Sequence, residues 1–137
     1  MASITEQSEK KHNLKTLLVE DNPSFRKLLK RILHEYFPLM VIEEAGNGRE
    51  ALQKVDSFCP DLILLDIRLP DESGLELTQK IKKECPNIII IILTSYDLPE
   101  YREAAIQKGA DAFMTKGSTT EEEIVALVKS HAQRMPS

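Results

Sequence analysis

Short aliphatic runs alternate along this sequence with longer stretches in which apolar residues return every three or four positions. The four residues Leu62–Leu65 are all aliphatic, and so are the six residues Ile88–Leu93. Runs of this length are typical of strands that are buried on both faces of a parallel sheet. Asp66 follows the first run directly, and ligand sites in open α/β sheets lie beyond the carboxyl ends of the strands. A single aspartate at such a place is more often a cap or turn residue, so its role depends on the other strand ends.

The same pattern predicts five strands that alternate with five helices. The clearest helix follows Asn22-Pro23, a cap residue and a residue suited to the first turn, and its apolar side chains return at helical spacing. A helix at about Pro99–Lys108 offers little apolar surface, so we expect it to be among the less firmly held elements. The predicted strands are Lys15–Glu20, Leu39–Ala45, Asp61–Asp66, Ile88–Leu93 and Asp111–Thr115.

Short connections between these elements limit the possible topologies. Crossovers between parallel strands are nearly always right-handed, so the economical arrangement is a parallel sheet with helices on both faces. A length of 137 residues suits one domain. We place this domain at residues 14–134, between a flexible polar tail at 1–13 and a short tail at 135–137. The predicted fold class is α/β, a flavodoxin-like doubly wound sheet with strand order 2-1-3-4-5.

Composition excludes several classes of function. Hydrophobic residues make up 42% of the chain and charged residues 29%, and the net charge is −4. Strong attraction to nucleic acid or to an anionic membrane is therefore not expected. The longest aliphatic run is far too short to span a bilayer, and residues 1–13 lack the apolar segment of a signal peptide. Cys59 and Cys85 have no metal-binding spacing, so we expect a cytoplasmic protein with two free thiols.

Chemically active side chains stand at four of the predicted strand ends. Glu20 and Asp21 follow the first strand, Asp66 the third, Thr94 the fourth and Lys116 the fifth. If the first strand is central, with the third and fourth to one side, these groups converge on one crevice. Two carboxylates about 5 Å apart repel by roughly 3 kcal/mol at an effective dielectric of 20, so the cluster needs a cation. A few hard oxygen ligands, supplemented by water, suit Mg²⁺.

A divalent cation beside an outward-pointing carboxylate indicates phosphoryl transfer. In this interpretation the metal and Lys116 neutralise charge on the transferring group, Thr94 donates to a phosphoryl oxygen and Asp66 attacks. Each residue also has an ordinary structural explanation, but their occurrence at four separate strand ends in a consistent order makes coincidence a poor one.

From about Leu14 to Arg134, the chain resembles the receiver domain of bacterial two-component response regulators. The segments LTSY and TKGS are similar to receivers that normally carry a LuxR-type helix-turn-helix output domain. The matching motifs are Glu20-Asp21, Asp66 within LILLDIRLPDESGLEL, Thr94-Ser95 and Lys116 within GADAFMTKGS.

This resemblance implies that Asp66 accepts a phosphoryl group from a sensor histidine kinase. It also implies that Mg²⁺ (or Mn²⁺) is bound by Asp21, Asp66 and the backbone carbonyl of Arg68, with Glu20 acting mainly through a metal-bound water. Such a domain catalyses only its own phosphorylation and autodephosphorylation, and is otherwise not an enzyme.

Thr94 and Phe113 occupy the family's switch positions, where the aromatic side chain rotates in concert with the hydroxyl residue after phosphorylation. The implied result is a changed surface for a partner or for a second copy in a homodimer, without direct contact between this domain and nucleic acid. Phe113 lacks the hydroxyl of the tyrosine that is often found there. Gly117 stands where many receivers have proline, which leaves open the isomer of the bond that precedes it.

Arg68 and Tyr96 stand two positions beyond Asp66 and Thr94, so they flank the mouth of the predicted pocket. They are either solvated surface residues or residues that screen the attacking water. The second interpretation predicts that they tune the lifetime of the phosphorylated state.

Three alternative functions remain to be weighed. Dehalogenase-like phosphatases also use an aspartate after a hydrophobic strand, but they need an acid two positions later, where this chain has Arg68. A flavodoxin-like cofactor carrier needs a phosphate-binding cradle after the first strand, where the acidic pair Glu20-Asp21 would repel phosphate. A pseudo-receiver that only binds partners is disfavoured because every acceptor residue is present.

Overall fold

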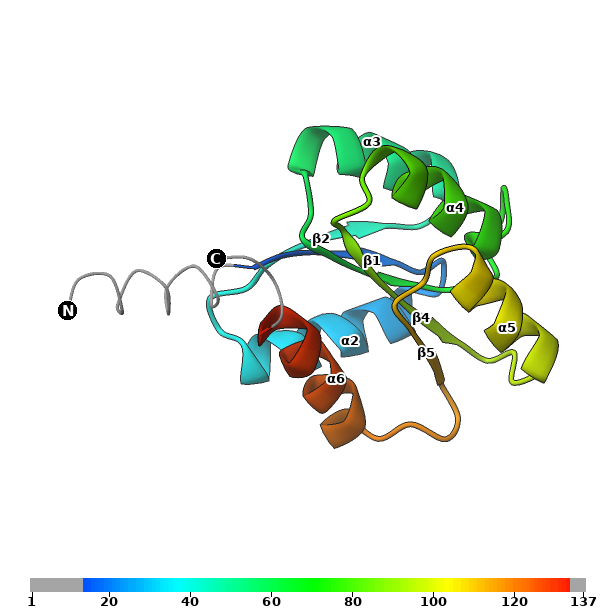
Figure 1. Cartoon of the computed structure of the whole chain (residues 1–137). Helices are drawn as coiled ribbons and strands as arrows, with labels where there is room; N and C mark the ends of the chain where they lie inside the picture. Colours follow the sequence, from blue (N-terminus) through cyan, green and yellow to red (C-terminus); the bar gives the residue numbers. More distant parts are fainter. Residues whose placement is uncertain (1–13, 134–137) are drawn as a thin grey trace.

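The computed structural model describes residues 14–133, which form a five-stranded parallel sheet between two layers of helices (Figure 1). The strand order is β2-β1-β3-β4-β5, so the predicted doubly wound topology is confirmed. The tails predicted at 1–13 and 135–137 lie outside the described residues. In chain order the elements are β1 (Lys15–Val19), α2 (Pro23–Tyr36), β2 (Val41–Ala45), α3 (Gly48–Phe58), β3 (Leu62–Leu65), α4 (Gly74–Glu84), β4 (Ile89–Thr94), α5 (Pro99–Gln107), β5 (Ala112–Thr115) and α6 (Glu121–Gln133).

Each face of the sheet has its own hydrophobic core. Side chains alternate along β3, so that Ile63 and Leu65 pack with α3, α4 and α5, whereas Leu62 and Leu64 pack with α2 and α6. Figure 1 shows α3 and α4 on one side of the sheet and α2 and α6 on the other. No helix within residues 14–133 has both the length and the apolar character needed to cross a membrane. The double burial explains why β3 is a continuous aliphatic run.

The second strand begins later than the sequence pattern predicts. The predicted start is Leu39, but β2 begins at Val41. Pro38 has no N–H to give to a ladder, and the Met40 N–H donates to the Phe37 carbonyl at 3.0 Å, which closes a turn before the strand. Sheet pairing then starts with the Val41 N–H, which donates to the Leu14 carbonyl at 2.9 Å.

Helix α5 is held by few apolar contacts, as the sequence predicts. Ala105 is its buried residue, while Ile106 is 52% exposed. Its cap residue Leu98 is 50% exposed and makes no side-chain capping bond. Because little apolar area is removed from water, this helix contributes less to its own anchoring than the other four.

A tight turn follows β3 and carries the chain from the strand end into α4. The Gly74 N–H donates to the Ile67 carbonyl at 2.6 Å, and Arg68 pairs with Ser73 in an antiparallel bridge. A Cβ at Gly74 would overlap the backbone carbonyl oxygen of Asp66 and lie 2.8 Å from the Ile67 Cα. The close approach of these two backbone segments therefore requires glycine.

We predict that Gly74→Ala lowers the free energy of unfolding by about 1–3 kcal/mol, because the added methyl group meets backbone atoms that cannot move aside. Gly117→Ala is the matched control, since no atom lies within 4 Å of a Cβ built there. Urea denaturation of the two variants measures the difference. Equal stabilities would show that the turn is not tightly packed.

Candidate functional site

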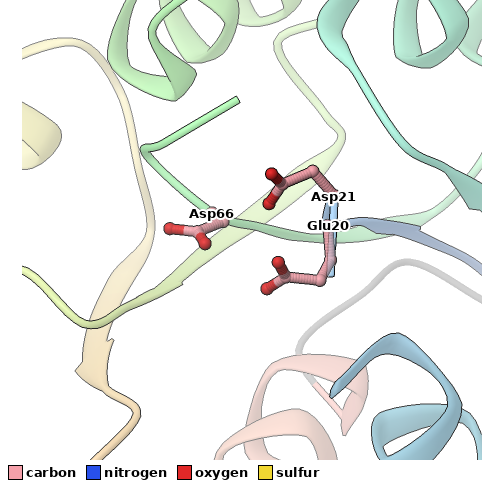
Figure 2. A group of neighbouring side chains, drawn as sticks. All are labelled: Glu20, Asp21 and Asp66. Carbon is pink, nitrogen blue, oxygen red and sulfur yellow. The ribbon is translucent and has the colours of Figure 1, made fainter. Parts of the chain in front are cut away.

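The carboxyl ends of β1 and β3 bring three acidic side chains together. These strands are paired in the sheet, with Val19 opposite Leu65, so the residues that follow them are neighbours. Glu20, Asp21 and Asp66 each place a carboxylate oxygen within 4.8 Å of the others. Figure 2 shows the three side chains projecting to the same side, beyond the strand ends. Glu20 and Asp66 are buried, and Asp21 is exposed.

The acidic side chains line a pocket of about 600 Å³ at this edge of the sheet. The predicted residues Thr94, Lys116, Arg68 and Tyr96 line it too, whereas Phe113 does not. The full lining is Glu20, Asp21, Asn22, Asp66, Arg68, Leu69, Pro70, Thr94, Ser95, Tyr96 and Lys116.

Lys116 connects the strand ends electrostatically. Its Nζ lies 2.5 Å from Glu20 Oε1 and 3.0 Å from Asp66 Oδ2, and 4.3 Å from the centre of the Phe25 ring. Burial alone would lower the pKa of Lys116, but its hydrogen bonds to the two carboxylates outweigh burial and raise that pKa above its ordinary value. The lysine is therefore a permanent cation at the base of the pocket. Phe25 belongs to the apolar face of α2, and no pattern in the sequence indicates its contact with Lys116.

Glu20 is held from two sides. Its Oε2 accepts the Asn22 N–H at 3.0 Å, and its backbone carbonyl accepts Arg26 Nη1 at 2.6 Å. Burial raises the pKa of the Glu20 carboxyl, and the charge of Asp66 adds to this effect against the opposing contacts with Lys116 and the Asn22 N–H. The site therefore disfavours the charged form of Glu20, and a further cation nearby would favour it.

The donor set fits a divalent metal ion. Three carboxylates face a pocket in which Lys116 supplies a single compensating charge in contact with two of them. The remaining Asp66 oxygen, Oδ1, accepts the Arg68 N–H at 3.3 Å. Clustered oxygen ligands with surplus negative charge are the pattern that hard cations prefer.

Comparisons with known proteins agree with this geometry. A family model described as the response regulator receiver domain matches residues 16–129. The chain belongs to the response regulator receiver domain family. These domains are the signal-receiving parts of two-component systems, which take their signal from histidine kinases.

Two curated relatives and one solved structure illustrate the likeness. The chemotaxis protein CheY of Halobacterium salinarum is 38% identical over 73% of this chain and 82% of its own length. The nitrate/nitrite response regulator NarL of Escherichia coli is 30% identical over 87% of this chain and 55% of its own length. The crystal structure of a LuxR-family response regulator from Aurantimonas has a TM-score of 0.81 and 27% identity, covering 90% of this chain and 87% of that one. The chain spans about half the length of the transcriptional regulators it matches, 44% in one case and 55% in NarL.

The predicted switch pair of this receiver domain is divided between the pocket and the adjacent face. Thr94 is buried at the pocket, and its Oγ1 accepts the Tyr96 N–H at 3.4 Å. Phe113 lies on β5, outside the pocket, with the Arg102 guanidinium 4.8 Å above its ring. Arg102 also donates to the Phe113 carbonyl at 3.3 Å, a contact that sequence patterns do not indicate. Every peptide bond within residues 14–133 is trans, including the one before Gly117.

Arg68 and Tyr96 meet across the mouth of the receiver pocket. Arg68 Nη1 donates to the Tyr96 hydroxyl, and the guanidinium lies 5.4 Å from the centre of the Tyr96 ring. The Tyr96 ring is in turn 5.5 Å from the ring of Tyr101 on α5. The two residues predicted to flank the mouth thus form a contact that connects the loop after β3 to the loop after β4.

We predict that Glu20 makes the metal-free protein less stable as pH rises. A raised folded pKa stabilises the fold fully below the unfolded value near 4.5, and this stabilisation is lost as pH rises through the folded pKa. Glu20→Gln lacks that titration. We measure the free energy of unfolding of both proteins by urea denaturation in EDTA. The value for wild type minus the value for the variant should decrease as pH rises from about 4 to about 7. A difference that is constant or rises with pH would contradict the assignment.

Proposed function

We propose that this chain is a phosphoryl-accepting receiver in which Asp66 is the acceptor. The observation that carries the proposal is the contact of Lys116 with both Glu20 and Asp66 beside a third carboxylate. One pocket thus contains a carboxylate nucleophile, a fixed cation and two further carboxylates that can bind a metal ion, as phosphoryl transfer to a carboxylate needs. The donor is a phosphohistidine of a sensor histidine kinase. The Asp66 carboxylate attacks phosphorus, an oxygen–phosphorus bond forms, and the nitrogen–phosphorus bond of the donor breaks.

The residues of this chain divide the work of that transfer. Lys116 stays protonated and pairs with negative charge on the incoming group, because its pKa is raised by the carboxylates. Thr94 supplies a hydroxyl at the pocket wall, positioned to donate to a phosphoryl oxygen. The Arg68 N–H donates to Asp66 Oδ1 and so orients the nucleophile. Burial of Asp66 limits competition from water.

Asp21, Asp66 and the Arg68 carbonyl would hold Mg²⁺ (or Mn²⁺), with Glu20 acting through a coordinated water. The bound ion would supply positive charge to the transferring phosphoryl group. Support for this assignment comes from the donor set, which consists of oxygen atoms: three carboxylates still leave one surplus negative charge after Lys116 and Arg68 are counted.

The output of phosphorylation is a changed surface on the side of α5 and β5. Thr94 and Phe113 would connect the pocket to this surface. Thr94 lines the pocket, and Phe113 lies beneath Arg102 of α5. Helix α5 is the weakly anchored element, so a small free-energy change at the pocket is enough to shift its equilibrium. A partner protein or a second copy of the chain then reads the shifted face.

We predict that Asp66→Asn takes up no phosphoryl group from acetyl phosphate in millimolar Mg²⁺, whereas wild type takes up one per chain, labile to hydroxylamine. The asparagine keeps the shape of the side chain and loses the nucleophile. Intact-mass spectrometry measures the uptake, and EDTA should abolish it in wild type. Asp56→Asn, an exposed aspartate of α3, is the control and should label fully. Stoichiometric labelling of Asp66→Asn would refute the assignment, and sustained release of phosphate would favour a phosphatase.

A second prediction concerns the lifetime of the phosphorylated state. Because Arg68 and Tyr96 both line the pocket, the double variant Arg68→Ala with Tyr96→Ala should widen its opening and expose the acyl phosphate to water. Its dephosphorylation rate should rise about tenfold, which corresponds to a barrier lower by roughly 1.4 kcal/mol. Hydrolysis is followed after removal of acetyl phosphate. A lifetime equal to that of wild type would leave the two side chains as surface residues.

A further inference from the structure

The loop between β3 and α4 is anchored by Asp71 to the start of a different helix. Asp71 Oδ1 accepts the Gly48 N–H at 2.8 Å, and Oδ2 accepts the Arg49 N–H at 3.0 Å. Gly48 and Arg49 are the first two residues of α3. One carboxylate thus uses both of its oxygens to join two elements that are distant in the sequence.

Helix α3 has no acceptor of its own for these two N–H groups. Its cap residue Asn47 accepts the Glu50 N–H at 2.8 Å, which satisfies the third position of the helix. Asp71 accepts the N–H groups of the first two positions, and its negative charge is favoured at a helix N-terminus. The Gly48 N–H lowers the pKa of Asp71 below its ordinary value, so the anchor is charged at neutral pH.

A second contact fixes the same loop on the same helix. The Glu72 side chain packs against Gly48 so closely that a Cβ there would lie 2.6 Å from Glu72 Oε2. Glu72 Oε1 is itself held 3.0 Å from Lys80 Nζ on α4. Glu72 therefore contributes packing against α3, which a glutamine of the same shape would keep, whereas the hydrogen bonds from the loop to this helix come from Asp71.

The residues just before Asp71 form one wall of the pocket that Glu20, Asp21 and Asp66 line. Arg68, Leu69 and Pro70 all line it, and Asp71 is the next residue along the chain. The base of the loop is closed by the Gly74 N–H, which donates to the Ile67 carbonyl at 2.6 Å. The position of the wall relative to the acidic cluster is consequently set at the base by this closure and at the tip by Asp71.

We propose that Asp71 is a positioning residue for the divalent cation of this pocket. It touches neither the cation nor the phosphoryl group, and it acts by holding the loop so that the Arg68 backbone stays in register with Asp21 and Asp66. This inference rests on the proposed function, because it concerns the affinity of the same pocket for Mg²⁺.

The test is the dissociation constant for Mg²⁺ alone, measured without a phosphodonor from amide chemical shifts, which also report whether each variant is folded. Asp71→Ala removes both acceptors and should raise the Kd about tenfold, as loss of an outer support does at other metal sites. Asp71→Asn keeps one acceptor oxygen, so its Kd should lie between those of wild type and Asp71→Ala. If Asp71→Ala does not fold, Asp71→Asn is compared with wild type in the same way.

Two control variants separate positioning from general effects. Asn47→Ala weakens the same helix end without touching the loop, and Glu72→Gln removes the same charge from the neighbouring residue. Both should keep the wild-type Kd. At saturating Mg²⁺, phosphorylation of Asp71→Ala by acetyl phosphate should return to the wild-type rate, because no group in contact with the phosphoryl group is lost.

An unchanged Kd in Asp71→Ala would overturn the proposal, and so would an equal rise in Asn47→Ala or in Glu72→Gln. The first control would then assign the effect to the stability of α3, and the second would assign it to charge. Wild-type protein that binds no Mg²⁺ would refute the proposed function together with this inference, whereas an effect missing only from the Asp71 variants refutes the inference alone.

Discussion

Repulsion among three carboxylates is the constraint on which the rest of this site depends. Oxygens of Glu20, Asp21 and Asp66 lie within 4.8 Å of one another, and a pair of charges at about 5 Å costs roughly 3 kcal/mol at an effective dielectric of 20. Lys116 offsets part of this cost and is itself held in the pocket by the two carboxylates it contacts. The doubly packed sheet supplies the stability that allows such an arrangement, and a local conflict of this kind marks a functional site.

Glu20, Asp66 and the loop after β3 are also held by groups that do not react. Arg26 donates to the Glu20 carbonyl, the Arg68 N–H donates to Asp66, and Asp71 fixes the loop that follows. These supports come from α2, from the loop after β3 and from the start of α3. Such supports fix the backbone and the two buried carboxylates of the cluster, because side chains that carry like charges would otherwise turn away from one another.

The sequence predicts those parts of the site that depend on strand ends. The aliphatic runs of β3 and β4 reveal buried strands, so the positions of Asp66 and Thr94 follow from topology, and the strand order is confirmed. Contacts between elements far apart in the chain have no such pattern. The Phe25 ring near Lys116 and the Asp71 anchor on α3 depend on how helices and loops pack, and each residue alone has an ordinary role in a helix or a turn.

The uneven anchoring of the helices suits the proposed passage of a signal from the pocket to a distant face. Arg68 contacts Tyr96 at the mouth, and the Tyr96 ring lies 5.5 Å from Tyr101 on α5, the helix with the least apolar support. A phosphoryl group beside Arg68 would compete with the Tyr96 hydroxyl for the guanidinium, because charge-assisted pairing is the stronger interaction. Release of Tyr96 would then alter the packing of α5 through Tyr101, without the involvement of Phe113. In the proposed function, α5 is the helix that a phosphoryl group in the pocket would shift, through Tyr96 and Tyr101 as well as through Thr94 and Phe113.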